Sequence, residues 1–225
     1  MKDLITIGLP SKGRLKDKAI SFFNDKGLKI LKSEKERNYF GSIENKKNIK
    51  IIFLHAKEII QRLGDGTLDI GISGLDLLKE SDKNLQGKIN VQKKLDFGNA
   101  NLVIAVPDDW IDVQTIADLE EVSFDIRLKR NSRLRVATKY PNLTNDFLIS
   151  KGVTQYKLVS SQGATETYPF IGSSEIISDI TSTGKTLVDN NLRVLKDGLI
   201  ISSSACLFCA KKKLAKIKKL NLFNY

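Results

Sequence analysis

The stretch "IKIIFLHAKEIIQRLGDGTLDIGISGLDLL" (residues 49–78) predicts a strand, a helix and a second strand in succession. Apolar residues run through 49–55 and 68–73, as in buried strands, and the intervening 56–64 has the spacing of an amphipathic helix. A helix between two such strands is typical of a parallel βαβ unit. The carboxyl ends of parallel strands lie at one edge of a sheet, so residues 74–78 are expected where such folds bind ligands.

The same alternation of strand and helix patterns extends on both sides of this stretch. Towards the amino end, "LITIGL" (4–9) is expected to form a buried strand, followed by a helix from Leu15 to Asp25 that ends at Gly27. The run "LIISSSACLFCA" (199–210) is expected to be a strand and a helix that return to the first unit. The other expected strands are 101–107, 133–139, 156–160 and 175–180, with helices near 114–121 and 142–152.

These patterns predict an α/β fold of two α/β lobes with a cleft between them, in a periplasmic-binding-protein-like (type II) architecture. Residues 1–98 and 188–225 are expected to form the first α/β lobe, and residues 99–187 the second. The chain has 225 residues, 41% of them hydrophobic, which is enough to bury a real core. No apolar run approaches the roughly 20 residues of a membrane helix, and Asp3 and Pro10 come too early for a secretory signal, so a cytoplasmic location is expected.

The net charge of +11 first suggests a polyanion such as nucleic acid as a partner. Six of the positive charges, however, lie in "KKKLAKIKKL" (211–220), so the rest of the chain carries only +5 of that total. Arginine, which forks phosphates and reads bases, occurs only eight times. These features disfavour a nucleic-acid partner, and we expect the Lys-rich tail to be a helix that packs Leu214, Ile217 and Leu220 against its own lobe or a partner subunit.

The two cysteines, Cys206 and Cys209, form a single CxxC pair among apolar residues. A zinc site needs four ligands, and the one histidine of the chain, His55, is distant in sequence. The pair also comes too late in the chain for a thioredoxin-type motif. We therefore predict two reduced thiols in the interior.

The segment "DITSTGKTL" (179–187) ends in Gly-Lys-Thr, like a P-loop, but Asp179 stands where the first glycine of that motif would be. A carboxylate at that place would repel a polyphosphate. Hydroxyl and backbone N–H groups just before a helix can still bind one monophosphate, and Asp179 would suit sugar hydroxyls. The segment is equally compatible with a turn whose hydroxyls only cap the next helix. The candidate donors are Thr181, Ser182, Thr183, Gly184, Lys185 and Thr186.

A set of motifs in a fixed order resembles the ATP phosphoribosyltransferase family over nearly the whole chain. The motifs are "GLPSKGRL", "LDIGISGLDLL", "LVIAVP", "RVATKYPNLT" and "SQGATETYPFIGSSEIISDITSTGKTL". The resemblance implies transfer of the 5-phosphoribosyl group of PRPP (5-phosphoribosyl 1-diphosphate) to N1 of the adenine of ATP, with release of pyrophosphate. This reaction opens histidine biosynthesis and uses Mg²⁺.

The resemblance also implies partners. The long form of the family carries an extra regulatory domain, and because this chain stops at Tyr225 it is expected to be the short form. The short form is paired with a regulatory subunit similar to histidyl-tRNA synthetase. We expect a homodimer within a hetero-oligomer, without a membrane partner.

The resemblance gives the candidate residues their expected roles. The loop 181–186 would hold the 5-phosphate of PRPP, with Asp179 on the ribose. Lys12 and Arg14 would be catalytic and neutralise the departing pyrophosphate, although Lys-Gly-Arg after a strand could also be a solvated turn. Glu166 would hold ribose hydroxyls or the metal, and would otherwise be a carboxylate at a helix start. Mg²⁺ would be bound mainly through substrate, with Glu166 or Asp179 as candidate protein ligands.

The remaining candidates concern ATP. Gly74, Leu75 and Asp76 would form one edge of its pocket, with a tight turn and an N-cap as the other interpretation. The other expected ATP-binding residues are Leu9 and Pro10, as the pocket floor, and Arg135, Lys139 and Tyr140, which would otherwise only close a lobe. His55 stands where many relatives have an arginine that reaches a nucleotide, so its role is open; a histidine at a strand end is more often structural.

Two interpretations from other classes stay open on the sequence alone. Two lobes would also suit a small-molecule-binding domain without catalysis, because a fold does not dictate a function. A nucleic-acid module that uses the Lys-rich tail is the third, and its binding would fall steeply with salt.

Overall fold

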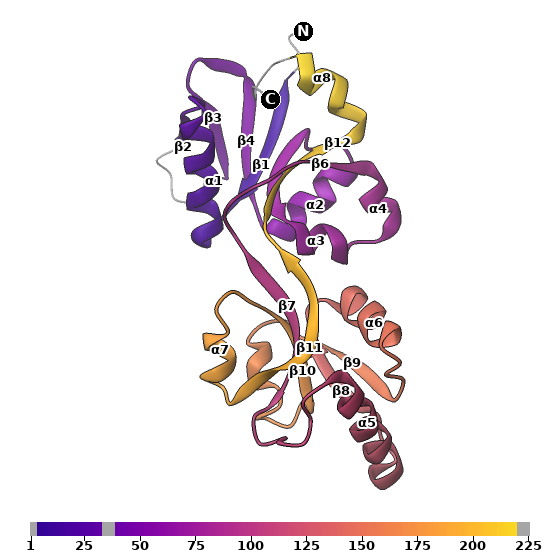
Figure 1. Cartoon of the computed structure of the whole chain (residues 1–225). Coiled ribbons are helices and arrows are strands. Elements are labelled where there is room, and N and C mark those ends of the chain that lie inside the picture. The colour runs from indigo at the N-terminus through magenta and orange to yellow at the C-terminus, as the bar shows by residue number, and fades with distance from the viewer. Residues whose placement is uncertain (1–3, 33–38, 220–225) are drawn as a thin grey trace. The chain divides into compact units, whose positions relative to one another are not determined.

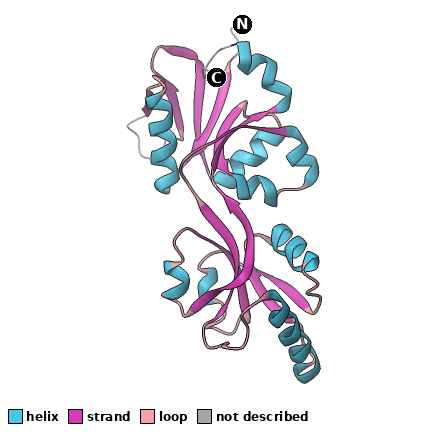
Figure 2. Cartoon of the chain, viewed as in Figure 1, coloured by secondary structure: helices cyan, strands magenta, loops and turns pink. Residues whose placement is uncertain are grey.

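The computed structural model of the chain describes residues 4–32 and 39–219. The chain forms two compact units, one of Met1–Gly98 and Ser204–Tyr225 and the other of Asn99–Ser203. Each unit has its own sheet with helices packed on it (Figures 1 and 2). The carboxyl-terminal part of the first unit therefore begins at Ser204. The sequence prediction placed this boundary at residue 188.

The first unit contains a seven-stranded sheet in the order β2-β3-β4-β1-β5-β12-β6. Strands β4, β1 and β5 are parallel neighbours, and β12 runs antiparallel to both β5 and β6. The strands are β1 (Ile5–Pro10), β2 (Ile30–Lys32), β3 (Phe40–Ile43), β4 (Lys46–Leu54), β5 (Ile70–Gly74), β6 (Ile89–Lys94) and β12 (Ala205–Ala210). The helices are α1 (Gly13–Asp25), α2 (Ala56–Gly64), α3 (Leu75–Glu80), α4 (Lys83–Lys88), η2 (Lys211–Lys213) and α8 (Leu214–Lys219).

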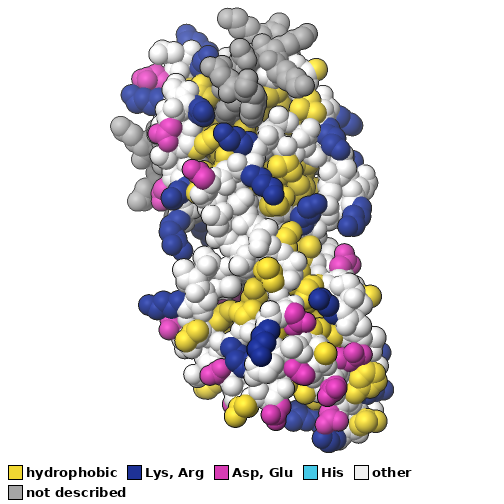
Figure 3. Space-filling model, in the orientation of Figure 1, with side chains coloured by type: hydrophobic (Ala, Val, Ile, Leu, Met, Phe, Trp, Pro, Cys, Tyr) yellow, Lys and Arg dark blue, Asp and Glu magenta, His cyan; other side chains and the backbone are white. Residues whose placement is uncertain are grey.

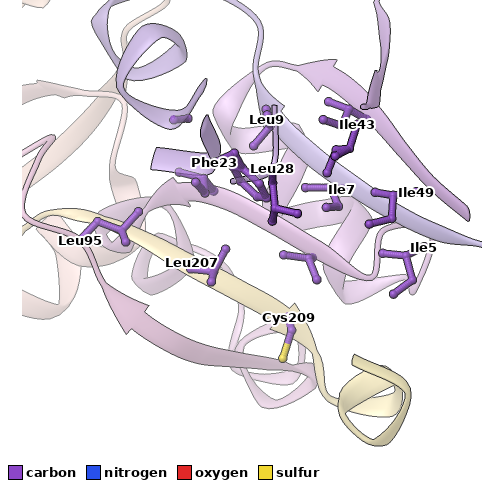
Figure 4. Packing of buried hydrophobic residues seen from close by; sticks show 14 of the residues in the cluster. Ile5, Ile7, Leu9, Phe23, Leu28, Ile43, Ile49, Leu95, Leu207 and Cys209 are labelled. Atoms are coloured by element: carbon purple, nitrogen blue, oxygen red, sulfur yellow. The ribbon is translucent and has the colours of Figure 1, made fainter. Parts of the chain in front are cut away.

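The core of the first unit follows from the two-residue period of its strands. Ile5, Ile7 and Leu9 of β1 point to one face and are completely buried, where Phe23 of α1 packs with them (Figure 4). Helix α1 ends at Asp25, and Gly27, two residues further on, has a φ of 72° that favours glycine. The predicted strands at 4–9, 49–55 and 68–73 are therefore confirmed as β1, β4 and β5, and the helix at 56–64 is confirmed as α2.

The carboxyl-terminal helix packs on its own unit. Ile217 is buried and Leu214 is partly buried against the core cluster that contains β1. The carboxylate of Asp69, which accepts a hydrogen bond from the Thr6 N–H, lies 3.8 Å from Nζ of Lys213 and 4.0 Å from Nζ of Lys216. Packing against its own lobe is thus confirmed for Leu214 and Ile217. Leu220 lies outside the described residues.

The predicted helix in "LIISSSACLFCA" is wrong. The run forms the end of β11 and all of β12. The prediction failed because β12 lies between β5 and β6 and is buried on both faces, so it lacks the alternation that identifies a half-exposed strand. Cys206 and Cys209 lie on β12 as free, buried thiols, and burial raises the pKa of each. The prediction of two reduced interior thiols is confirmed.

The second unit contains a five-stranded sheet in the order β11-β7-β10-β8-β9. Strands β10, β8 and β9 are parallel neighbours, while β7 runs antiparallel to β10 and β11. Because β11 pairs with β7, the segment 188–203 belongs to this unit. The strands are β7 (Ala100–Pro107), β8 (Leu134–Thr138), β9 (Tyr156–Ser160), β10 (Ile176–Thr181) and β11 (Leu192–Ser203). The helices are α5 (Ile116–Arg130), α6 (Pro141–Ser150), η1 (Thr165–Thr167) and α7 (Lys185–Val188).

Helix α5 is longer than the helix expected near 114–121. It begins at a capping box in which Thr115 and Asp118 bond each other's backbone N–H groups, and it ends at Asn131 in the left-handed conformation. Hydrogen bonds from the side chain and backbone of Thr115 lower the pKa of Asp118.

No helix in the described ranges is both long enough and apolar enough to cross a bilayer.

Candidate functional site

The carboxyl ends of β8, β9 and β10 meet at one edge of the second sheet. Thr138 of β8 is paired in register with Ser160 of β9 and with Ser178 of β10. The segments that follow these strands carry the sequence candidates Lys139 and Glu166, and Asp179 comes directly after Ser178. Three neighbouring parallel strands thus bring candidates that are distant in sequence to one edge of this sheet.

The loop after β10 is fixed by its own hydroxyl groups. The Gly184 N–H donates to Thr181 Oγ1 at 2.9 Å, and the Lys185 N–H donates to Thr183 Oγ1 at 3.4 Å. Gly184 has a φ of 77°, which suits glycine. The side chains of Ser182, Thr183, Lys185 and Thr186 are exposed around this turn. Because α7 has only four residues, its dipole adds little, and the donors of the loop itself must carry any anion binding.

Asp179 is half-buried at the end of β10, and its Oδ1 accepts a hydrogen bond from the Ile180 N–H at 2.8 Å. The preceding residue, Ser178, is completely buried and faces the interior. Asp179 is therefore the carboxylate that this strand end offers to a ligand.

Glu166 lies in η1, which packs against β10. The turn before it is ordered by a 2.9 Å hydrogen bond between the hydroxyls of Ser161 and Thr165. Tyr168, just after Glu166, packs against the cluster that contains Leu187 of α7. The carboxylate-bearing turn and the hydroxyl-rich loop are therefore neighbours in one unit.

Lys139 and Tyr140 differ in their environment. Lys139 is exposed, whereas Tyr140 is 8% exposed and donates its backbone N–H to Thr138 Oγ1 at 2.9 Å. Pro141 then occupies the first position of α6, where a missing N–H is harmless. Lys139 is free to meet solvent or a ligand, while Tyr140 contributes mainly to packing.

Arg135 lies at the other end of β8, three residues before Thr138. Its Nη2 is 2.6 Å from Oε1 of Glu175, and its backbone N–H donates to Oε2 of the same carboxylate at 2.7 Å. Burial alone would raise the pKa of Glu175, but the hydrogen bonds from Arg135 outweigh it and lower that pKa. The pair lines a cavity of about 990 Å³ together with Pro107 and Trp110. The structure therefore does not bring Arg135 to the edge that carries Lys139.

The carboxyl ends of β4, β1 and β5 form a corresponding edge in the first unit. The loop after β1 is tied to the end of β4 because the Ser11 N–H donates to the Leu54 carbonyl at 2.8 Å. Lys12 is the exposed N-cap residue of α1, and Arg14 is exposed in its first turn. Two cationic side chains thus lie together at this edge.

Of the residues expected around ATP, several are less accessible than the sequence suggested. Leu9 is 0% exposed in the core and Pro10 is buried, so both can support a pocket only from behind. Gly74 is the N-cap of α3, and Asp76 is 5% exposed and lies against it. A side chain on Gly74 would overlap Oδ1 of Asp76, so the close packing of Asp76 depends on this glycine. Leu75 is half-buried beside them.

His55 is the N-cap residue of α2 and is exposed. Its Nδ1 accepts the Lys57 N–H at 3.4 Å. The structure therefore assigns His55 a capping role.

Sequence reasoning missed one group of residues at the second edge. The hydroxyls of Thr138, Thr144 and Ser178 are buried and bonded to one another behind Lys139 and Asp179. The available signal was a polar residue after buried apolar residues in β8 and β10, at Thr138 and Ser178, whereas Thr144 lies among polar residues and gave no signal.

The arrangement of charged side chains among the described residues bears on whether there is a second site. On the face drawn in Figure 3, Lys and Arg side chains are scattered rather than gathered in one continuous patch. Within residues 4–32 and 39–219, no group of three or more His, Cys, Asp or Glu side chains is arranged to hold a metal ion.

Comparison with known sequences gives one consistent family. A family model for ATP phosphoribosyltransferase (HisG) matches residues 55–223. The chain is also similar to the ATP phosphoribosyltransferase of Chelativorans sp. (strain BNC1), with 45% identity over 210 residues, 93% of this chain and 91% of that protein.

Comparison with solved structures concerns the fold. The ATP phosphoribosyl transferase (HisG:HisZ) complex from Thermotoga maritima contains a chain that is 24% identical with a TM-score of 0.75, over 98% of this chain and 94% of that chain. An ancestral amino acid-binding protein, AncCDT-1, is 13% identical with a TM-score of 0.55, over 98% of this chain and 87% of that chain. The expected fold class, two α/β units of the periplasmic-binding-protein type, is confirmed.

Proposed function

The chain belongs to the ATP phosphoribosyltransferase family, and from this premise we propose which of its residues carry the reaction. The enzyme transfers the 5-phosphoribosyl group of PRPP to N1 of the adenine of ATP and releases pyrophosphate, the first step of histidine biosynthesis. The residues that bind each substrate and the leaving pyrophosphate are assigned from the positions of the candidates.

The loop 181–186 binds the 5-phosphate of PRPP in this proposal, and Asp179 binds ribose hydroxyls. The observation that carries it is the meeting of the carboxyl ends of β8, β9 and β10, which supports one site built from Asp179, Glu166 and the loop. Thr181 and Thr183 accept the N–H bonds that hold the turn and keep their own hydroxyl protons, so the exposed side chains of Ser182, Thr183, Lys185 and Thr186 can all donate to phosphate oxygens. A preformed turn binds without a large ordering cost.

Lys12 and Arg14 neutralise the departing pyrophosphate. Adenine N1 is already a nucleophile, so the reaction depends on orientation of the two substrates and on charge stabilisation at the leaving group. Both side chains are exposed at the carboxyl edge of β1. Their flexibility lets them follow charge that develops on the diphosphate oxygens.

Mg²⁺ is held mainly through the oxygens of PRPP. This ion typically takes one or two carboxylates together with substrate phosphates. The residues present fit that pattern, because Glu166 and Asp179 supply single carboxylates at neighbouring turns of the second unit. When bound, the ion would reduce the negative charge on the leaving diphosphate.

For ATP, the candidate in the first unit is the turn of Gly74, Leu75 and Asp76, and the candidate in the second unit is Lys139, as a cationic contact for nucleotide phosphate. Leu9, Pro10 and Tyr140 act as buried supports of these elements, since their side chains are covered. We leave Arg135 out of the proposed site because Glu175 holds it at the opposite edge of its sheet.

A regulatory partner belongs to the same proposal. The Thermotoga maritima structure is a HisG:HisZ complex, which supports the short form with a histidyl-tRNA-synthetase-like subunit. We propose a homodimer within a cytoplasmic hetero-oligomer.

Transfer of label from ribose-labelled PRPP to ATP tests the proposed function, with and without the candidate partner subunit. Labelled phosphoribosyl-ATP is expected from the unaltered chain, and much less from Asp179→Asn at low PRPP. A small-molecule-binding domain would retain both ligands and form no product in either condition.

A further inference from the structure

Three buried hydroxyl groups connect two strand ends of the second unit through a helix. Thr144 Oγ1 lies 2.8 Å from Ser178 Oγ and 3.3 Å from Thr138 Oγ1. Thr138 Oγ1 also accepts the Tyr140 N–H at 2.9 Å. The three side chains are 2%, 0% and 0% exposed for Thr138, Thr144 and Ser178. Buried hydroxyls at these distances form a chain of hydrogen bonds.

The hydrogen bonds of this chain run in one direction. Each hydroxyl has a single proton to donate. Because Thr144 donates its proton to Ser178, Thr138 must donate to Thr144, and the Tyr140 N–H in turn donates to Thr138. The direction of the chain fixes where the hydroxyl protons of Thr138 and Thr144 point, and linked bonds strengthen one another.

The chain lies directly behind the proposed substrate site. Thr138 and Ser178 are register partners on β8 and β10, and each comes one residue before a site residue, Lys139 and Asp179. Thr144 stands in the second turn of α6, whose first turn begins at Pro141. Thr144 therefore links α6 to the carboxyl ends of both β8 and β10.

Apolar side chains of similar volume could fill the space that the three hydroxyl side chains occupy. The neighbours of the chain on the same strands, Ala137 and Ile177, are buried and apolar, and valine has nearly the shape of threonine. Hydroxyls supply what valine cannot, which is a directional bond that fixes how β10 is turned about its axis relative to β8 and α6. That rotation sets the direction of the Asp179 carboxylate.

We propose that Thr144, through Thr138 and Ser178, is a positioning residue for PRPP: it fixes the strand end that presents Asp179 and the loop 181–186 to the sugar phosphate. The inference rests on the proposed function, because it assigns PRPP to that loop. Thr144 itself touches no substrate.

The test compares Thr144→Val with Thr144→Ser in the full chain, assayed with the regulatory subunit where activity requires it. Thr144→Val is expected to raise the KM for PRPP about tenfold, since a displacement well below 1 Å at a binding site already has effects of this size. Thr144→Ser keeps the hydroxyl and should stay within about twofold of the unaltered enzyme. The KM for ATP and the thermal midpoint of Thr144→Ser should change little.

The matched control is Ser123→Ala. Ser123 is also completely buried in the second unit, but its hydroxyl donates to the Glu120 carbonyl within α5. Loss of a buried hydroxyl in general would lower the thermal midpoint of both variants, whereas only Thr144→Val should change the KM for PRPP. Calorimetric titration with ribose 5-phosphate gives the same comparison without turnover.

The outcomes separate the inference from the proposed function. An unchanged KM for PRPP in Thr144→Val, together with a raised KM in Asp179→Asn, would overturn the positioning role and leave the PRPP site standing. An unchanged KM in Asp179→Asn and Thr183→Val would overturn the site itself. If Thr144→Val does not fold, Ser178→Ala breaks the same bond and is judged by the same KM comparison.

Discussion

Arg135 and Glu175 form a salt bridge at one edge of the second sheet, and the proposed PRPP loop lies at the opposite edge of the same sheet. The two side chains come from the amino ends of neighbouring strands, with Arg135 Nη2 2.6 Å from Glu175 Oε1. Glu175 is largely covered, with 13% of its side chain exposed. The pair satisfies a buried carboxylate and links β8 to the segment before β10, so we assign it to stability rather than to catalysis.

Glu175→Gln should therefore destabilise the chain without changing substrate affinity. Loss of hydrogen bonds to a buried charged group costs about 2 kcal/mol. The control Glu121→Gln changes an exposed carboxylate on α5 and should be close to neutral. Urea unfolding and the KM for PRPP measure the two effects. A raised KM in Glu175→Gln with unchanged stability would reverse the assignment.

The same pair predicts a pH dependence of stability. The pKa of Glu175 is lowered in the folded chain, so the folded state favours the ionised form. Its contribution is fully present above the ordinary pKa of a glutamate and is lost as the pH falls through the lowered folded pKa. Unfolding free energies measured from pH 7 downward should decline less in Glu175→Gln than in the unaltered chain; parallel curves would contradict this.

Asp179→Asn and Thr183→Val should each raise the KM for PRPP by about tenfold or more, equivalent to about 1.4 kcal/mol of lost binding. Asp179 loses its negative charge toward ribose hydroxyls, and Thr183 loses the hydroxyl that accepts the Lys185 N–H and holds the turn. Asp189→Asn, an exposed carboxylate just after α7, is the control. Equal KM values for all three variants would exclude the loop as the PRPP site.

Lys12→Ala should mainly lower kcat, by roughly ten- to a hundredfold, because its charge is needed most when pyrophosphate departs. Lys18→Ala removes an exposed lysine from the same helix and should have little effect. Turnover at saturating PRPP and ATP is the measurement. Normal turnover of Lys12→Ala under those conditions would refute the leaving-group role.

Gly74→Ala should impair ATP binding more than PRPP binding. The added methyl group would overlap Oδ1 of Asp76 and force this buried side chain to move. Gly87→Ala is the matched control, because a methyl group there meets nothing within 4 Å and alanine favours a helix by about 1 kcal/mol. The ratio of the two KM values in each variant decides; an unaffected KM for ATP in Gly74→Ala would remove Asp76 from the proposed ATP site.

The buried parallel strands could be predicted from the sequence because each is a continuous apolar run, as in β1 and β5. The same property led to the wrong prediction of a helix at β12, because a run that is buried on both faces has no period to distinguish strand from helix. The length of α5 was underestimated because exposed apolar residues, Phe124 and Leu128, interrupt its amphipathic pattern. Its capping box at Thr115 marks the start, and the pattern alone could not mark the end.

Candidate site residues could be proposed from the sequence where they are consecutive, and they were hidden where they depend on tertiary contacts. The loop 181–186 and Lys12 are local motifs, and Lys12, Ser182, Thr183, Lys185 and Thr186 are exposed. The pairing of Arg135 with Glu175, forty residues away, and the burial of Tyr140 follow only from the register of β8 with its neighbours. The hydroxyl chain through Thr144 is likewise invisible until the strands are paired.

Backbone amide chemical shifts during titration with ribose 5-phosphate test the central claim most directly. The account predicts the largest changes at Ser182, Thr183, Gly184 and Lys185, with smaller ones at Asp179, and their loss in Thr183→Val. Largest changes at the first-unit turn of Gly74 to Asp76, with the loop 181–186 unmoved, would contradict it.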